Sequence, residues 1–423
     1  MEGVLYSKAY LAVLLFAALL GIPVSLLAFA FLTAVHELEH LVWETLPQAL
    51  GYDTVPPWWP LAALGLAGLL VALTVTHLPG RGGHVPAHGL GTGPTAARDL
   101  PGTLLAAAAS LVLGAVVGPE APLIALGSGL AVLAVTRVNA TSTATVTSVL
   151  SAAGSAAAIS AVFGNPVVAA ILFLEVLGLA RRRTMMVVLP CLVSCGVGAV
   201  VFTGLGGWTG LEIGSLRVPG LTASHLDVAA VLWTLPLAVG VAVAMRGVFA
   251  IGRRTAELAS SRPVVVTLAA GLLAGASAAV YAVGTGHSPG EVARSGQATL
   301  ADLAAEPAQW STGALTMLLV CKGIAFALCL GAFRGGPVFP AVFLGTATGT
   351  LAGTVLPALA PMSGLAIGMA AAVTVTRLPV TSVVLVVLLL GPAAANQMPV
   401  VILAAVAAFV AHEIPLRRAR ADA

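Results

Sequence analysis

Long apolar runs, separated by short segments rich in Gly, Pro and polar residues, organise this chain. The first run, 11–32, is long enough as an α-helix to cross about 30 Å of hydrocarbon. It is followed by runs of helical length at 60–78, 102–117, 122–136, 143–163, 166–179, 184–203, 228–246, 264–284, 312–332, 338–357, 361–376, 379–391 and 398–411. Several runs are shorter than a full span, which is typical of half-spanning helices, and period-two alternation is absent. The pattern predicts an all-α membrane protein.

Composition supports this prediction and excludes several classes of protein. Hydrophobic residues make up 59% of the 423 positions and charged residues only 8%, whereas soluble proteins carry about 25% charged residues. A net charge of +3 is too small to indicate a nucleic-acid partner. The four cysteines lie within apolar runs, where we interpret them as helix-packing residues. The 47 glycines and 26 prolines indicate broken helices, which often build transport sites.

Basic clusters predict how the chain is oriented in the lipid bilayer. They lie at 181–183, 253–254 and 417–420, and cytoplasmic loops are the ones enriched in Arg and Lys. Two predicted spans separate the first two clusters, and two more lead to Arg334, so all of them are expected on one side. We therefore expect a multi-pass protein of the plasma (inner) membrane with both termini in the cytoplasm. Residues 1–423 form one membrane domain, with a short basic tail at 413–423.

An internal repeat divides the predicted domain into two related halves, 9–203 and 228–412. Each half has a Gly/Pro segment followed by an apolar run, at 118–122 and at 335–340, and each has a Gly five residues after the last Pro. Downstream, three consecutive alanines precede Pro166 in the first half and Pro379 in the second. Repeated halves with broken helices place a substrate site near the middle of the membrane, where the halves meet.

Three Gly/Pro segments stand before apolar runs and are the candidate binding loops, with ordinary connecting loops as the alternative. A helix that begins inside the membrane exposes unpaired N–H groups and its positive dipole end. Several such ends make an anion site without a basic side chain, and a buried Arg or Lys would bind the anion too tightly for release. The candidate anion-binding residues are Gly82, Gly83, His84, Val85 and Pro86; Gly118, Pro119, Ala121 and Pro122; and Gly336, Pro337, Val338, Phe339 and Pro340.

Glu120 is the most informative acidic residue, because it lies inside one of these loops between two apolar runs. A carboxylate buried in a membrane is costly and usually functional. At an anion site it occupies the anion's place when ionised and leaves when protonated. We therefore predict that Glu120 is a gate, with a water-exposed loop glutamate as the alternative.

These segments resemble the signatures of the CLC family of chloride channels and chloride/proton exchangers. Gly118-Pro119-Glu120-Ala121-Pro122 looks like Gly-Arg/Lys-Glu-Gly-Pro, with Glu120 at the external gating glutamate. Gly336-Pro337-Val338-Phe339-Pro340 resembles Gly-x-Phe-x-Pro, and Gly82-Gly83-His84-Val85-Pro86 resembles Gly-Ser-Gly-Ile-Pro. The order holds from about residue 9 to 415. The resemblance implies a CLC-type bundle of two inverted-topology repeats, a homodimer with one anion pore per subunit, chloride or a similar small anion as substrate, and no cofactor.

The chain departs from the family at several functional positions. Gly83 replaces the family's central serine, so no hydroxyl contacts the anion there, and Val338 replaces a Phe and leaves only its backbone N–H as a donor. The stretch ending in Glu175-Val176 has Val176 where exchangers carry the internal proton glutamate. Pro415-Leu416-Arg417 stands where the family commonly has its pore tyrosine, so the inner gate region near Arg417 is expected to be more open. The last helix looks truncated, with no C-terminal regulatory domain.

Together these departures predict passive or weakly proton-coupled anion conduction through a pore gated by Glu120. The alternative is a coupled anion/proton antiporter that routes protons through water or another acid such as Glu175. Lys322, inside an apolar run, is expected either to add positive potential to the pore or to snorkel to the surface. His287 and Glu291 are expected to face water in an outer loop, and His88 beside the first Gly/Pro segment is expected to be solvated.

One motif favours a different class of protein. His36-Glu37-Leu38-Glu39-His40 matches H-E-x-x-H, in which two histidines on one helix face bind zinc and the glutamate acts as a base. An intramembrane zinc metalloprotease is therefore the distant alternative. It needs a third ligand, and the aspartates all fall in expected loops or the tail. The sequence predicts an interfacial helix here, no metal site and no enzyme.

Overall fold

The computed structural model describes residues 7–138, 143–177, 184–209, 218, 221, 225–356, 358–374 and 376–421, without the side chains of residues 177, 184, 298 and 415–421. The first half contains α2 (Lys8–His40), a π-helical turn (Leu41–Thr45), α3 (Leu46–Ala49), α4 (Trp59–His77), α5 (Leu100–Val112), α6 (Glu120–Val138), α7 (Ala144–Phe163), α8 (Pro166–Leu177) and α9 (Thr184–Thr209). The second contains α10 (Val228–Ser261), α11 (Pro263–Thr285), α12 (Gln297–Ala305), α13 (Thr312–Ala332), α14 (Val338–Val355), α15 (Pro361–Thr374), α16 (Pro379–Leu390) and α17 (Ala394–Ala421).

Each predicted apolar run coincides with a helix over most of its described residues, so the all-α prediction is confirmed, although 113–117 lie beyond the end of α5. The runs missed α12, which is short and sits in the loop between α11 and α13. In the described part of the chain, ten helices are long and apolar enough to cross a membrane, and 166–176 and 361–374 are shorter apolar helices. The chain is therefore an integral, multi-pass membrane protein.

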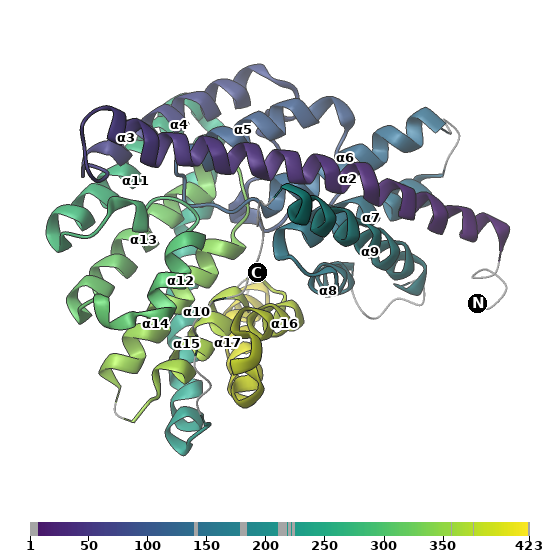
Figure 1. Cartoon of the computed structure of the whole chain (residues 1–423). Helices are drawn as coiled ribbons and strands as arrows, with labels where there is room; N and C mark the ends of the chain where they lie inside the picture. The colour runs from purple at the N-terminus through teal and green to yellow at the C-terminus, as the bar shows by residue number, and fades with distance from the viewer. Residues whose placement is uncertain are drawn as a thin grey trace.

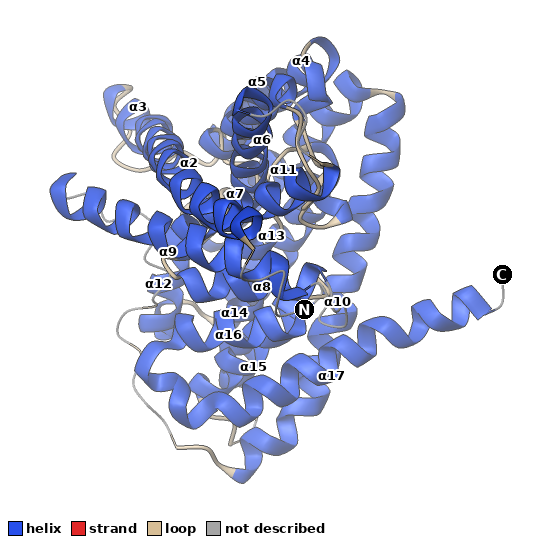
Figure 2. Cartoon of the chain, turned by 90° about the vertical axis from the view of Figure 1, so that its right-hand side faces the viewer, coloured by secondary structure: helices blue, strands red, loops and turns tan. Residues whose placement is uncertain are grey.

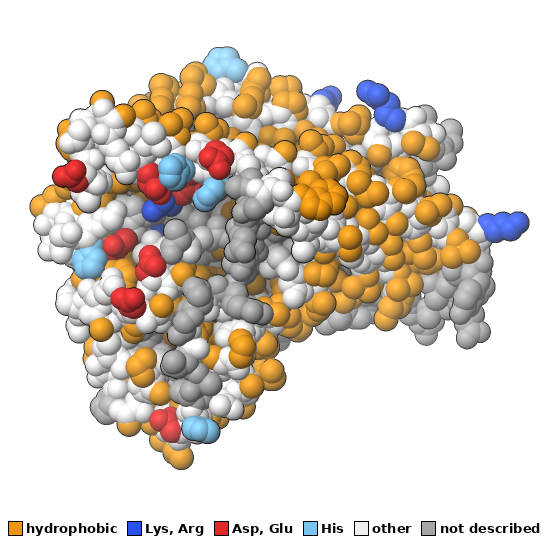
Figure 3. Space-filling model, in the orientation of Figure 1, with side chains coloured by type: hydrophobic (Ala, Val, Ile, Leu, Met, Phe, Trp, Pro, Cys, Tyr) orange, Lys and Arg blue, Asp and Glu red, His pale blue; other side chains and the backbone are white. Residues whose placement is uncertain are grey.

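The outer surface carries the apolar side chains that a lipid-facing helix needs. On α2, Leu11, Leu15 and Leu19 are between 52% and 63% exposed, and hydrophobic side chains cover much of the face around this helix in Figure 3. In water such a surface would be strongly unfavourable, whereas hydrocarbon solvates it well. These exposed leucines are therefore suited to contact with lipid rather than with other helices of the bundle.

The two halves of the chain pack against each other rather than forming separate units. Figure 1 shows α2 lying across the bundle, with α4 beside α11 from the other half. Elsewhere α8 of the first half contacts α16 of the second. Turned by 90°, the bundle shows the C-terminal end of α17 projecting from its side (Figure 2). Residues 413–421 continue this helix, and their assignment as a basic cytoplasmic tail stays a prediction.

Glycines bring equivalent helix pairs into close contact in both halves. In the first half, a Cβ on Gly127 of α6 would lie 2.1 Å from the carbonyl oxygen of Gly154 in α7. In the second, a Cβ on Gly349 of α14 would lie 2.2 Å from the carbonyl oxygen of Gly364 in α15. Backbones can approach this closely only where neither residue has a side chain in the way. This shared packing agrees with related halves, while their bounds at 9–203 and 228–412 stay a prediction.

We expect Gly349→Ala to destabilise the protein by about 1–3 kcal/mol, the usual cost of overpacking a tight core. The added methyl group must push α15 away from α14, since the atom it meets is backbone. The matched control is Gly323→Ala in α13, where a Cβ meets nothing within 4 Å. Thermal aggregation of the detergent-solubilised variants measures both. Equal midpoints for the two variants would show that the α14–α15 contact tolerates a methyl group.

Candidate functional site

The second and third Gly/Pro loops meet each other inside the bundle. Gly118 and Gly336 form an isolated antiparallel bridge, with Gly118 N–H donating to the Gly336 carbonyl at 2.7 Å and the reverse bond at 2.5 Å. Each loop leads directly into a helix, because α6 begins at Glu120 and α14 begins at Val338. The predicted juxtaposition of two membrane-embedded helix starts is present in the structure.

Glu120 is fully buried at the junction of these two helix starts. Its Oε1 accepts a hydrogen bond of 2.9 Å from the backbone N–H of Phe339, in the first turn of α14. Its Oε2 is buried without a hydrogen-bond partner. A Cβ on Gly336 would lie 1.8 Å from Oε2, so the carboxylate occupies space that any other residue at 336 would fill. A negative group is thus held at the positive end of α14, where the backbone N–H groups of Phe339 and Val338 both act on the carboxylate.

The first Gly/Pro loop differs from its prediction, because no α-helix begins at it. Short 3-10 turns at Pro79–Gly82 and Pro86–His88 flank it, and the next helix, α5, starts only at Leu100. Gly82 and Gly83 both adopt positive φ, at 74° and 83°, which turns the chain sharply instead of starting a helix. Two of the three loops therefore present helix starts, and the first presents a bent backbone.

Arg334 lies buried beside the Gly/Pro loops, where the sequence predicted an anion site without a basic side chain. It is only 9% exposed, and its Nη1 donates to the carbonyl of Phe333 at 3.1 Å while Nη2 reaches the carbonyl of Arg81 at 3.4 Å. Its side chain thus ties the first loop to the third. Burial lowers the pKa of Arg334 to about 10, which leaves the guanidinium charged at neutral pH. The side of the membrane on which Arg334 lies stays a prediction, and its place directly before Gly335-Gly336-Pro337 is the sequence signal for its position at the third loop.

Arg334 and His84 line a cavity of about 10 Å³ together with Ala121 and Pro122, and a single water-sized particle fits there. The Nε atom of Arg334 and the Nε2 atom of His84 are buried without a partner among the described residues. Burial lowers the pKa of His84 below its ordinary value, and the nearby Arg334 charge acts in the same direction. Ala121 and Pro122 directly follow Glu120, so the cavity lies next to the first turn of α6.

Gly83 lacks the hydroxyl of the family's serine, but a hydroxyl from another element stands next to it. A Cβ on Gly83 would lie 2.9 Å from Thr103 Oγ1 in α5, and Thr103 also lines the small cavity. This hydroxyl donates its proton to the Asp99 carbonyl at 2.9 Å. As arranged, it offers no donor to an anion, so the backbone and Arg334 are the donors on this side.

Glu175 caps a helix of the opposite half. Its Oε1 accepts from the backbone N–H of Val380 at 2.8 Å, and its Oε2 accepts from the N–H and the hydroxyl of Thr381, each at 2.7 Å. These bonds satisfy the free amides at the start of α16. Val176, the next residue, is partly buried against the apolar core. Arg417 continues α17, but its side chain lies outside the described residues, so the predicted inner gate region is not placed.

Lys322 neither faces the small cavity nor snorkels. It is completely buried, and its Nζ donates to the carbonyls of Glu291 at 2.7 Å and Val292 at 3.1 Å while lying 4.4 Å from the Phe343 ring. It thereby fixes the segment after α11. From that segment the Arg294 N–H donates to the Gly114 carbonyl at 2.8 Å, just before the Gly118 loop.

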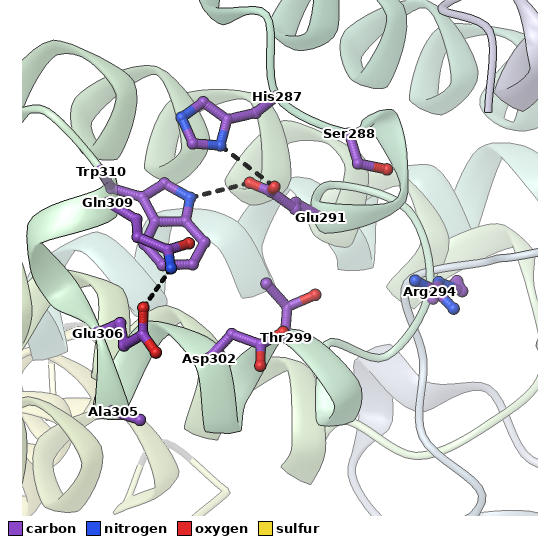
Figure 4. Close-up of a pocket in the computed structure, with 10 residues that line it drawn as sticks. All are labelled: His287, Ser288, Glu291, Arg294, Thr299, Asp302, Ala305, Glu306, Gln309 and Trp310. Carbon is purple, nitrogen blue, oxygen red and sulfur yellow. Dashed lines mark hydrogen bonds and ion pairs between the residues drawn. The ribbon is translucent and has the colours of Figure 1, made fainter. Parts of the chain in front are cut away.

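The outer loop expected to face water is instead a bonded cluster. Figure 4 shows His287 and Trp310 directed at Glu291, whose carboxylate accepts from Trp310 Nε1 at 3.0 Å and lies 3.3 Å from His287 Nδ1. Tyr281 adds a hydrogen bond of 2.5 Å to the same carboxylate. The Glu291 side chain is only 13% exposed. The cluster lines one wall of an open cavity of about 360 Å³.

The H-E-x-x-H motif lies near the C-terminal end of α2 and its side chains have other partners. His40 Nε2 lies 3.1 Å from Glu44, and Glu39 lies 3.5 Å from Arg294 of the outer loop. Among the described residues, no group of three His, Cys, Asp or Glu side chains is placed to hold a metal ion. The geometry does not supply the third ligand that the protease alternative requires.

Comparisons with known proteins agree with this arrangement of helices and loops. The sequence profile described as voltage gated chloride channel matches residues 87–412. The chain is 27% identical over 347 residues to "Putative ion-transport protein YfeO" of Escherichia coli O1:K1 / APEC, covering 81% of this chain and 79% of the relative. The protein of the same name from Shigella boydii serotype 4 (strain Sb227) is 28% identical over 349 residues, with the same coverage.

Two solved structures share the fold at low sequence identity. The crystal structure of a slow cyanobacterial Cl-/H+ antiporter superposes with a TM-score of 0.76 at 18% identity, covering 97% of this chain and 98% of the other. A CLC-type fluoride/proton antiporter superposes with a TM-score of 0.67 at 17% identity, covering 95% and 96%. At these identities the likeness concerns the fold.

Proposed function

Because the chain belongs to the voltage gated chloride channel (CLC) family, we propose that it carries chloride or a similar small anion across the membrane along a path gated by Glu120. The observation that supports this proposal most directly is the hydrogen bond from the Phe339 backbone amide to the Glu120 carboxylate, at the start of α14. An anion that replaced the carboxylate would gain the same amide and the same helix dipole. The ionised side chain therefore closes the path, and a protonated one opens it.

The small cavity beside Arg334 and His84 supports an anion position next to this gate. A charged guanidinium with an unpaired Nε in low dielectric is stabilised by a nearby negative charge, and no carboxylate lines this cavity among the described residues. Arg334 also shares its other N–H groups with backbone carbonyls, which weakens its hold on an anion. Arg334 is therefore compatible with release of the anion, although the sequence predicted that a buried arginine would bind the anion too tightly.

We favour passive or weakly proton-coupled conduction. Val176 replaces the internal proton glutamate of the resembled exchangers, and Glu175 is committed to the start of α16 by three hydrogen bonds. Both carboxylate oxygens of Glu175 are thus engaged in fixing the start of α16. Neither residue is suited to carry protons during transport.

A coupled anion/proton antiporter is the second candidate. Both solved structures described above are of antiporters, one for chloride and one for fluoride. In that reading protons reach Glu120 through water instead of a fixed internal acid. Under either reading, the resemblance to the family supports a homodimer in the plasma membrane with both termini in the cytoplasm.

A liposome experiment separates the two candidates. Purified wild-type protein is reconstituted, an outward chloride gradient is imposed with the membrane voltage clamped by valinomycin and potassium, and proton uptake and chloride release are recorded together. We expect chloride release with proton movement at the level of protein-free liposomes. Proton movement against its gradient, in fixed proportion to chloride, would establish the antiporter and overturn passive conduction.

A further inference from the structure

A second cavity, of about 340 Å³, lies at the far end of the first Gly/Pro loop and is lined by basic side chains. The turn at Ala87–Gly89, which directly follows Gly82–Pro86, forms one wall. Helix α10, the turn between α15 and α16, and α17 form the others. The charged and polar side chains that face the cavity are Arg246, Arg253, Arg377, His88, His412 and Thr376. Its volume is within the usual range for small-ligand pockets.

The charges around this basic pocket are poorly compensated. Arg246, Arg253 and Arg377 all act electrostatically on His412, and Glu413 is the acid that acts on it in the opposite sense. Glu413 lies 3.2 Å from Arg377 Nε. One carboxylate against three guanidinium groups leaves a net positive charge even with both imidazoles neutral. Converging like charges repel each other unless an anion lies between them.

Two of the lining groups are buried without partners. His412 is only 7% exposed, and its Nδ1 atom has no hydrogen-bond partner among the described residues. The Nη1 atom of the half-buried Arg246 is likewise buried without a hydrogen-bond partner. Burying a nitrogen donor without an acceptor is unfavourable, and in folded proteins such groups usually have a partner. These groups come from helices α17 and α10, which pack against each other. The pocket thus offers fixed nitrogen groups to a ligand.

We propose that this basic pocket binds a phosphate group, carried by a soluble phosphate compound or by an anionic lipid headgroup. Guanidinium groups match the oxygens of phosphate in paired hydrogen bonds, and a phosphate brings more than one negative charge to three arginines. A halide offers one charge and no directional acceptors, so it compensates the pocket less well. The inference goes beyond the proposed function, because it assigns a second ligand to a different part of the molecule.

A phosphate bound here lies against Ala87–Gly89, a few residues after Arg81, whose carbonyl accepts a hydrogen bond from Arg334. It therefore restrains the segment that borders the anion path and adds negative charge beside its opening. We expect occupancy of the pocket to slow anion transport. Arg253 and Arg254 are predicted to face the cytoplasm, so the ligand approaches from that side.

The binding test uses full-length protein in neutral detergent, in gluconate buffer, with pyrophosphate titrated by calorimetry. We expect saturable binding to the wild type that weakens about tenfold or more in Arg246→Gln and Arg377→Gln. The control is Arg254→Gln, which removes an exposed charge from the same helix outside the pocket. Gel filtration and thermal aggregation confirm that each variant is folded. Pyrophosphate affinity that is unchanged in both pocket variants, or no tighter than that of chloride, would overturn the assignment.

Nanodiscs distinguish the two sources of phosphate. If the occupant is soluble, pyrophosphate binds equally in nanodiscs of phosphatidylcholine with or without phosphatidylglycerol. If it is a headgroup, phosphatidylglycerol suppresses pyrophosphate binding, and Arg246→Gln lowers the amount of phosphatidylglycerol that co-purifies. Both outcomes support a phosphate site. Absence of pyrophosphate binding in detergent and in both kinds of nanodisc, with no loss of co-purified phosphatidylglycerol in the variant, would contradict it. These measurements record binding and not anion transport, so they can be interpreted even if the proposed function is wrong.

Discussion

Replacing Glu120 by Gln is expected to raise anion flux about tenfold at neutral pH and to remove its dependence on pH. The amide keeps the size of the side chain but loses the charge that holds it at the start of α14. A charge-assisted hydrogen bond and the helix dipole together account for about 1.4 kcal/mol or more, which corresponds to a factor of ten in gate occupancy. In the wild type, protonation releases the carboxylate, so flux is expected to rise as the pH falls. The Gln variant has no group to protonate, and its flux stays high at every pH.

Chloride release from liposomes at several pH values measures both effects. Glu257→Gln, which removes an exposed carboxylate from α10, is the matched control and is expected to behave as the wild type. A Glu120→Gln variant that is folded, yet has wild-type flux and wild-type pH dependence, would refute the gate. The result does not depend on whether wild-type transport is coupled to protons.

Substitutions of Arg334 are expected to have the second large effect, on the apparent affinity for the anion. Arg334→Gln removes the buried charge beside the small cavity, and we expect the chloride concentration for half-maximal flux to rise roughly 10- to 100-fold. Arg334→Lys keeps the charge but cannot reproduce the fork that bonds the carbonyls of Phe333 and Arg81. It should recover part of the affinity.

This pattern separates a role in anion binding from a purely structural one. If Arg334 only holds the first and third loops together, both variants should lower thermal stability while leaving the chloride dependence of the remaining flux unchanged. Arg98→Gln, whose side chain is 85% exposed in the wild type, controls for the loss of a positive charge. Flux titrated against chloride, combined with thermal aggregation of the same samples, decides between the two.

Most of the helices and part of the site could be predicted from local sequence. The apolar runs lie in helices because helix formation in lipid depends on a continuous apolar stretch, which is a local property. Glu120 was identifiable because a carboxylate between two apolar runs is rare enough to need a function. The helix start at Val338 also followed from its Gly/Pro segment, since proline and glycine act on their own backbone.

The predictions that failed concerned contacts between distant positions. Arg334 has the sequence signature of a cytoplasmic loop residue, and only the folded bundle buries it against a carbonyl from residue 81. Snorkelling of Lys322 to the surface was left open by the sequence and is wrong, because its Nζ is buried against the carbonyls of a loop about 30 positions away. Glu291 was predicted to face water, but Tyr281 and Trp310 donate hydrogen bonds to its carboxylate.

The sequence by itself determined that this chain spans a lipid bilayer as an all-α protein, where Gly/Pro loops interrupt its helices, and which acid stands in such a loop. Those properties depend on the hydrophobicity and backbone preferences of neighbouring residues. The tertiary structure alone decided that Glu120 reaches α14, that His84 and Arg334 border one cavity, and that Arg246, Arg377 and His412 border another. Such groups are buried or unpaired because of what surrounds them in space, and that environment is created only when helices distant along the chain pack together.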